Sequence, residues 1–211
     1  MSAAVELADY RRQVAELYAE VRRRSADSPV AAWRLWREGR DVLFKKHPQS
    51  PLRPEQRQSF QALSYFDYDA TYRLEAHLDP PEALDLLEVE LEDDGLMKMV
   101  PAGVVRLQRG EDTFRLCVYR VLGYGGGLFL PFRDATCQSE TFGGGRYLID
   151  TIKGADLGSA SDRLILDFNF SYNPSCAYSP QWSCPLAPVE NWLECRIQAG
   201  EKRFQSPPGH L

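Results

Sequence analysis

Residues 87–99 read Leu-Glu-Val-Glu-Leu-Glu-Asp-Asp-Gly-Leu-Met-Lys-Met and carry a clear structural signal. From Leu87 to Leu91, apolar side chains occupy every second position with glutamates between them, which is the period of a half-buried strand. Asp93-Asp94-Gly95 supplies a turn, and the alternation resumes on a return strand that includes Met99. This stretch predicts an antiparallel β-hairpin.

The same two-residue period recurs on both sides of the hairpin. Further strands are expected at 72–78, 105–107, 114–118, 128–132, 147–152, 164–168 and 193–197. Short strands joined by tight turns indicate antiparallel pairing rather than alternating β-α-β units. We therefore expect a mainly β domain, an antiparallel sandwich or barrel-like structure, with two or three N-terminal helices packed against it (α+β overall).

The first 64 residues have helical periodicity. An apolar stripe between Tyr10 and Val21 predicts a first helix. Ser28-Pro29 is a helix start, and the stripe Trp33, Trp36, Arg40, Leu43 and Phe44 runs on to the stop at His47-Pro48. A third, shorter helix is expected from Pro54 to about Leu63. One folding unit is predicted, comprising a helical cover over 1–64, a β domain over 65–204 and a disordered tail over 205–211.

Composition excludes several classes of protein. The 211 residues carry a formal net charge of −5, whereas a nucleic-acid binder would present a basic face. No apolar run is long enough for a membrane span, and the N-terminus lacks the apolar core of a signal peptide. An odd number of cysteines, five, favours reduced thiols and a cytoplasmic location.

Two triple-glycine runs lie between residues 122 and 147. The second, which ends in Gly144-Gly145-Arg146-Tyr147, could present backbone N–H groups and a guanidinium to a phosphate or carboxylate. It lacks the Gly-Lys-Ser/Thr ending of a P-loop and the strand–helix setting of a dinucleotide fold. Glycines that only form bulges or barrel corners are an equally weighted interpretation.

The segment 167–185 concentrates amides, aromatic rings and prolines. Asn169 and Asn173 are candidate ligand-binding residues, and Tyr172 and Tyr178 are candidate hydroxyl donors. Asp167 in this segment, and Glu140 before the glycine run, are candidate proton carriers if they are desolvated. The competing interpretation is a rigid loop held by its own hydrogen bonds.

Cys176 and Cys184 lie in the second half of the same segment. Their spacing is wider than that of zinc ligand pairs, so no metal site is expected. Cys176 is a candidate nucleophile, with His47 as a base that only the fold could bring near. A disulfide between the two cysteines stays open, and buried apolar thiols are the more common case.

Several longer strings resemble a known family. Glu140-Thr141-Phe142-Gly143-Gly144-Gly145-Arg146-Tyr147-Leu148 is similar to the "ETYGGGRYL" segment of the bacterial and archaeal family catalogued as domain of unknown function 1684. Asp167-Phe168-Asn169, Tyr172-Asn173-Pro174, Cys176-Ala177-Tyr178 and Cys184-Pro185-Leu186 are similar to its later signature, and Glu190-Asn191 and Ala199-Gly200-Glu201 to its closing motif. Phe142 replaces the usual tyrosine, and Trp192 stands where arginine commonly follows Glu-Asn. The resemblance gathers the candidate residues, Asn191 among them, but implies no reaction and no cofactor.

The leading hypothesis from sequence is a small-molecule pocket, with enzymatic activity left open, in which Arg146 anchors an anionic ligand beside the 167–185 loop. The first alternative is a non-catalytic binding or assembly module that uses the aromatic loop at an interface, such as a homodimer. The second is a flavin-binding split barrel. The ligand, any cofactor and the reaction are not identified by the sequence.

Overall fold

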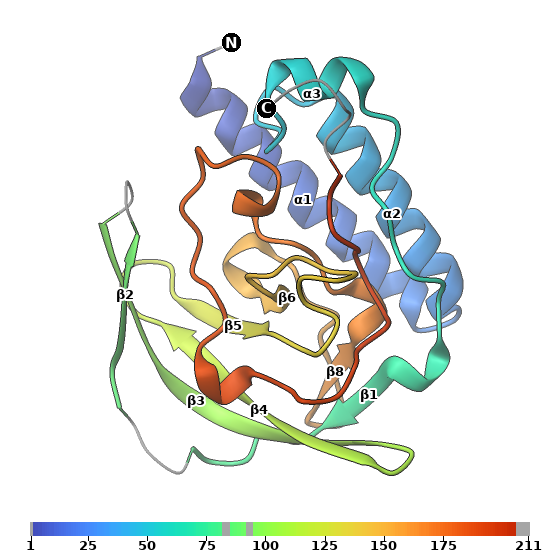
Figure 1. Ribbon diagram of the computed structural model, residues 1–211, viewed down its shortest axis with the longest axis vertical. Helices are drawn as coiled ribbons and strands as arrows, with labels where there is room; N and C mark the ends of the chain where they lie inside the picture. Colours follow the sequence, from blue (N-terminus) through green and yellow to red (C-terminus); the bar gives the residue numbers. More distant parts are fainter. Residues whose placement is uncertain (1, 82–84, 92–94, 206–211) are drawn as a thin grey trace.

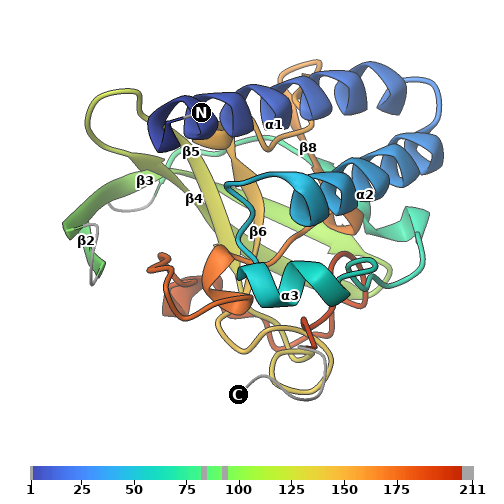
Figure 2. The ribbon, with the colours of Figure 1, turned by 90° about the horizontal axis from the view of Figure 1, so that it is seen from above.

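The computed structural model describes residues 2–81, 85–91 and 95–205, and it begins with helices (Figure 1). The helices are α1 (Ala3–Ser25), α2 (Pro29–Lys46) and α3 (Pro54–Ser59). The first two pack against each other and lie over one end of the β structure (Figure 2). Among the described residues, no helix combines the length and the apolarity that a bilayer crossing requires.

The limits of α2 follow from its sequence signals. The Ser28 Oγ accepts the Ala31 N–H at 3.4 Å, and Pro29 occupies the first helical position. His47 ends the helix in extended conformation. Helix α3 stops at Ser59, short of the predicted Leu63, because the Leu63 N–H bonds to the Asp41 carboxylate of α2 at 2.9 Å instead of continuing the helix.

The larger sheet has the order β2-β3-β4-β5-β6, and each strand pairs antiparallel with its neighbours. Its strands are β2 (Leu87–Leu91), β3 (Gly95–Arg109), β4 (Asp112–Val121), β5 (Gly127–Phe132) and β6 (Arg146–Asp150). Figure 1 shows the long β3–β4 pair curving around the body of the molecule, so the sheet forms a half-barrel. The predicted hairpin is confirmed by the pairing of β2 with β3, although its turn residues 92–94 lie outside the described residues.

A smaller antiparallel sheet has the order β1-β8-β7. It consists of β1 (Arg73–Ala76), β8 (Arg163–Asp167) and the two-residue β7 (Ser159–Ala160), which the sequence analysis did not predict. Side chains of both sheets share one apolar cluster, which includes Val105, Leu116 and Phe168. The predicted fold class is therefore confirmed: antiparallel β structure covered by N-terminal helices.

The strand predicted at 193–197 is wrong. The segment pairs through isolated backbone bonds only, from Leu193 N–H to the Arg133 carbonyl at 2.8 Å and from Ala135 N–H to the Cys195 carbonyl at 3.0 Å. The Ile197 N–H then bonds to the Asp134 carboxylate at 2.7 Å. A side chain thus takes the position that a ladder carbonyl would need, so no regular strand forms. The tail predicted over 205–211 lies outside the described residues from position 206.

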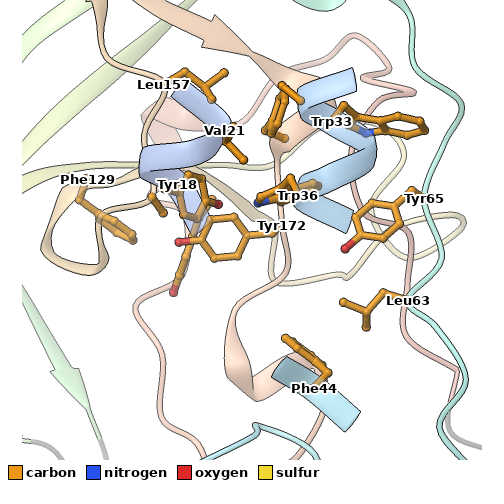
Figure 3. Packing of buried hydrophobic residues seen from close by; sticks show 14 of the residues in the cluster. Tyr18, Val21, Trp33, Trp36, Phe44, Leu63, Tyr65, Phe129, Leu157 and Tyr172 are labelled. Atoms are coloured by element: carbon orange, nitrogen blue, oxygen red, sulfur yellow. The ribbon is translucent and has the colours of Figure 1, made fainter. Parts of the chain in front are cut away.

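A second apolar cluster joins the helices to the sheets (Figure 3). In this cluster Tyr18 of α1 and Trp36 of α2 pack with Phe129 of β5 and with Tyr172, which lies in the loop after β8. Burial of such large side chains stabilises by roughly 1.5–3 kcal/mol each. The helices therefore contribute to the main core, and the candidate site lies where this core is incompletely filled.

Candidate functional site

A cavity of about 430 Å³ lies between the two long helices, the curved sheet and the loop 172–185. Helix α1 contributes one wall, and α2 contributes Arg40, Leu43 and Phe44. Strands β3 to β6 form the opposite wall, with Phe129 and Tyr147 among their contributions. The volume is within the range of small-molecule sites, and most of the lining is apolar.

The cavity has an exposed mouth and a buried floor. At the mouth, Leu7 of α1 is 47% exposed and Ile152 is 45% exposed, and Arg11 is also exposed. At the floor, Tyr18 is 4% exposed and Tyr172 is 8% exposed. Figure 3 shows these two rings beside each other. A ligand would therefore enter along the N-terminal half of α1 and reach a dry, aromatic end.

The floor is held by a buried ion pair. The Arg40 Nη2 donates to the Glu201 carboxylate at 2.7 Å and to the Tyr178 hydroxyl at 3.3 Å, while its Nε donates to the Tyr65 hydroxyl at 3.1 Å. The Tyr178 hydroxyl in turn donates to Glu201 at 2.5 Å. Burial raises the pKa of Glu201, whereas Arg40 and these hydrogen bonds oppose that rise. The network fixes the Arg40 guanidinium against the cavity.

Two polar atoms at the floor have no hydrogen-bond partner among the residues that the structure describes. They are the Tyr172 hydroxyl and the Asn173 Oδ1, and both residues line the cavity. The Asn173 Nδ2 is engaged, because it donates to the Lys202 carbonyl at 2.8 Å. An unpaired buried polar group costs roughly 1–3 kcal/mol, so native proteins usually provide a partner for it.

Charge at the mouth is predominantly positive. Of the charged residues that line the cavity, Arg11, Arg40 and Lys153 are cationic and Asp150 is anionic. Asp150 is paired with Lys153 at 2.8 Å, and Glu201 neutralises Arg40 at the floor. Arg11 is exposed and the Lys153 side chain is 43% exposed, so both cations are accessible to solvent.

Four of the residues predicted as site residues meet at this cavity: Tyr147, Tyr172, Asn173 and Tyr178. The Tyr147 ring contacts Tyr172 edge-on with centroids 5.7 Å apart, and its hydroxyl donates to the Pro185 carbonyl at 2.6 Å. Burial raises the pKa of Tyr172. That hydroxyl therefore stays protonated and can donate a hydrogen bond. Cys176 does not line the cavity, but its N–H donates to the Sγ of Cys184, which does, at 3.3 Å.

Arg146 occupies a different place. Its side chain is fully buried, and it pairs with the equally buried Asp134 at 3.1 Å. It also donates to the Ile197 carbonyl at 2.9 Å and bonds to the Ala199 carbonyl. Arg146 does not line the cavity. Arg146 therefore connects β6 to the C-terminal segment through hydrogen bonds, which agrees with a structural role for the glycine–arginine turn.

The glycines before Arg146 permit this packing. Gly145 has a φ of +92°, and a Cβ there would lie 2.5 Å from the Phe132 carbonyl oxygen. At Gly144, a Cβ would meet the Phe142 ring at 2.5 Å. Close approach of backbone and ring, rather than contact with a ligand, explains both positions.

The amides at 169 and 191 have all their polar atoms engaged. The Asn169 Oδ1 accepts the backbone N–H of Asp69. The Asn169 Nδ2 donates to the Asp69 carbonyl and, at 2.8 Å, to the Asp167 carboxylate. Asn191 accepts the Cys117 N–H at 2.7 Å and donates to the Cys117 and Pro131 carbonyls. Neither residue lines the cavity, and each joins a loop to a neighbouring segment.

The three predicted proton carriers are dispersed. Asp167 is buried and accepts bonds from Asn169, and burial raises the pKa of its carboxyl. Glu140 forms an ion pair with Arg196. His47 lies 3.3 Å from the Asp9 carboxylate and accepts the Gln49 N–H through Nδ1. None of the three lines the cavity, so the structure does not assemble them into one acid–base site.

Sequence reasoning missed the cationic and α1 parts of the site. Arg40 had a visible signal, because an arginine in the middle of a tryptophan- and phenylalanine-rich stripe must be buried with the stripe. Arg11 and Lys153 had none, since exposed basic residues are common in helices and turns. Their proximity depends on how α1 lies across the end of β6.

The fold and cavity together define an α+β protein whose N-terminal helices cover a half-barrel and enclose a small apolar site. The chain belongs to the family described as protein of unknown function (DUF1684), whose model matches residues 58–202. A similar solved structure is the solution NMR structure of an uncharacterised protein from Haloarcula marismortui. It is 38% identical, with a TM-score of 0.58, and the match covers 79% of this chain and 89% of that chain. A comparison with curated proteins finds no match.

Proposed function

We propose that this protein binds a small, elongated and mainly apolar molecule that carries an anionic group at one end and an uncharged polar group at the other. The observation that carries the proposal is the pair of buried, unpartnered atoms, the Tyr172 hydroxyl and the Asn173 Oδ1, at the end of an apolar cavity. A ligand hydroxyl could accept from one and donate to the other.

The anionic group belongs at the mouth rather than at the floor. Glu201 already neutralises Arg40 at 2.7 Å, so a second carboxylate beside them would be buried without a matching cation. At the mouth, Arg11 and Lys153 remain accessible to solvent and can attract an anion at modest desolvation cost. The apolar middle of the ligand would lie against Val14, Leu17 and Phe129.

The test is a thermal-unfolding comparison of three probes at sub-micellar concentration: ω-hydroxydodecanoate, dodecanoate and dodecanol. The expected order of stabilisation is the hydroxy acid, then the acid, then the alcohol. A probe present at a hundred times its Kd stabilises by about 2.7 kcal/mol. For a chain of this length that corresponds to a rise in Tm of roughly 5–10 °C.

Two variants test the binding of the anionic end and of the polar end of the ligand separately. Arg11→Gln combined with Lys153→Gln should reduce the advantage of dodecanoate over dodecanol, whereas Tyr172→Phe should remove the advantage of the hydroxy acid over the plain acid. Arg12→Gln is the matched control, because Arg12 is an exposed α1 cation that does not line the cavity. Equal shifts for all three probes, or shifts that Arg12→Gln reduces as much, would contradict the proposal.

The two alternatives from sequence differ from this proposal in what they require. An interface built on Tyr178 or Trp182 needs those rings to be exposed, yet Tyr178 is 5% exposed and the Trp182 Nε1 donates to the Pro51 carbonyl at 3.1 Å. These rings hold the loop against α2 and the segment that follows it. Adding a flavin to the probe series tests the split-barrel alternative directly, since bound flavin also changes its visible absorbance.

A further inference from the structure

Two cysteine thiols lie close together beside the cavity. Cys176 belongs to the short helical turn Ser175–Ala177, and its N–H donates to the Cys184 Sγ at 3.3 Å. Both residues are half-buried, and Cys184 lines the cavity. The segment 178–183 between them contains no helix or strand.

The surroundings of Cys184 favour its thiolate. The Cys176 N–H donates to its sulfur, and the neighbouring Cys176 thiol, the Ser175 N–H and Lys153 also favour the charged form. These neighbours, the Cys176 thiol most of all, lower the pKa of Cys184, and the proximity of the two sulfurs raises the pKa of Cys176. The pair thus has the asymmetry of a nucleophilic thiolate and a protonated resolving thiol.

The other thiols lack this arrangement. Burial raises the pKa of both Cys117 and Cys195. Among the described residues, no cluster of three or more His, Cys, Asp or Glu side chains is arranged to hold a metal ion. Cys176 and Cys184 therefore stand as a two-sulfur site without the further ligands that zinc needs.

We propose that Cys184 and Cys176 form a reversible dithiol–disulfide site that reacts with small disulfides, of which glutathione disulfide is the simplest biological example. The Cys184 thiolate attacks one sulfur of glutathione disulfide, which breaks its S–S bond and releases one glutathione thiolate. Cys176 then gives its proton to solvent and attacks the Cys184 sulfur, releasing the second glutathione thiolate. The protein is oxidised by two electrons, and one glutathione disulfide is reduced to two glutathione molecules.

The experiment is incubation of the reduced, full-length protein with glutathione disulfide at pH 7, followed by intact-mass measurement and peptide mapping. The wild-type chain should lose two hydrogens and yield a peptide pair cross-linked through Cys176 and Cys184. Cys176→Ser should stop at one glutathione adduct on Cys184, because the resolving thiol is missing. Cys195→Ser is the matched control and should react as the wild-type chain does.

A pH profile tests the order of attack without any variant. Alkylation of Cys184 by iodoacetamide should reach its plateau at a lower pH than alkylation of Cys195, because the pKa of Cys184 is lowered and that of Cys195 is raised. Accumulation of a glutathione adduct on the wild-type chain without cross-linking would overturn the proposal. So would a Cys184 profile that follows Cys195. Because these readouts do not depend on the cavity probes, the proposal can fail separately from the proposed function.

Discussion

Removing the Tyr172 hydroxyl should stabilise the ligand-free protein while weakening ligand binding. The hydroxyl is buried at the cavity floor with no partner in the described part of the chain. The ring that carries it packs against Tyr147, and the Arg40 guanidinium lies 5.1 Å from its centroid. Tyr172→Phe keeps the ring and both contacts. It removes only a polar atom whose burial is unfavourable.

The magnitude follows from the cost of an unsatisfied polar group, roughly 1–3 kcal/mol. Because the floor adjoins a cavity, where a hydroxyl is less strongly desolvated than in a packed core, we expect about 1 kcal/mol. In a chain of 211 residues that raises Tm by roughly 2–4 °C. Tyr178→Phe is the matched variant, because its hydroxyl donates to Glu201 at 2.5 Å. Loss of a bond to a charged group should lower the free energy of unfolding by about 1.5–3 kcal/mol.

Urea unfolding followed by tryptophan fluorescence measures both variants, provided that the m-value is unchanged from the wild-type chain. Opposite signs for the two phenylalanine substitutions support the assignment of Tyr172 as a ligand-facing group. Destabilisation by Tyr172→Phe equal to that by Tyr178→Phe would refute the reasoning. In that case the Tyr172 hydroxyl contributes to the fold itself.

Three further outcomes test the structural roles. Arg146→Met should destabilise by roughly 3–5 kcal/mol in urea unfolding, because it leaves the Asp134 carboxylate buried and unpaired; a cost below 1 kcal/mol would contradict the pairing. Gly145→Ala should destabilise by more than 2 kcal/mol because of the clash with backbone, whereas Gly125→Ala, also at positive φ but with open space around it, should cost roughly 1 kcal/mol. Burial raises the pKa of the Asp167 carboxyl above 3.8 in the folded state. The folded chain therefore binds this proton more readily than the unfolded chain, and the stability that this gives is lost as pH rises through the folded-state pKa. The wild-type advantage over Asp167→Asn should therefore widen as pH falls toward 3.8, and a constant difference would contradict this sign.

Local patterns were sufficient for most of the secondary structure. The alternation from Leu87 to Leu91 predicted β2 and its hairpin partner, and Ser28-Pro29 and His47-Pro48 predicted the ends of α2. These signals are local, because side-chain period and capping depend on residues within one or two turns of each other. Where a side chain from elsewhere took over a backbone bond, as Asp134 does at Ile197, the local pattern predicted a strand that does not form.

The sequence likewise predicted part of the candidate site but not all of it. The aromatic and amide residues of the loop after β8 could be recognised from their composition, and Tyr172, Asn173 and Tyr178 do line the cavity. Composition could not distinguish them from Asn169, whose amide atoms are all used by Asp69 and Asp167. Whether a polar side chain is engaged or left unpartnered depends on the neighbours that packing gives it.

The roles of the two arginines show this most directly. In the sequence, Arg146 beside three glycines suggested an anion site, and Arg40 in an apolar stripe suggested only packing. Tertiary structure pairs Arg146 with the buried Asp134 and places Arg40 between Glu201 and the cavity. The type of a residue sets what it can bond to, but its available partners lie up to 161 positions away in the chain. Only the folded arrangement brings those partners within bonding distance and decides which arginine lines the cavity.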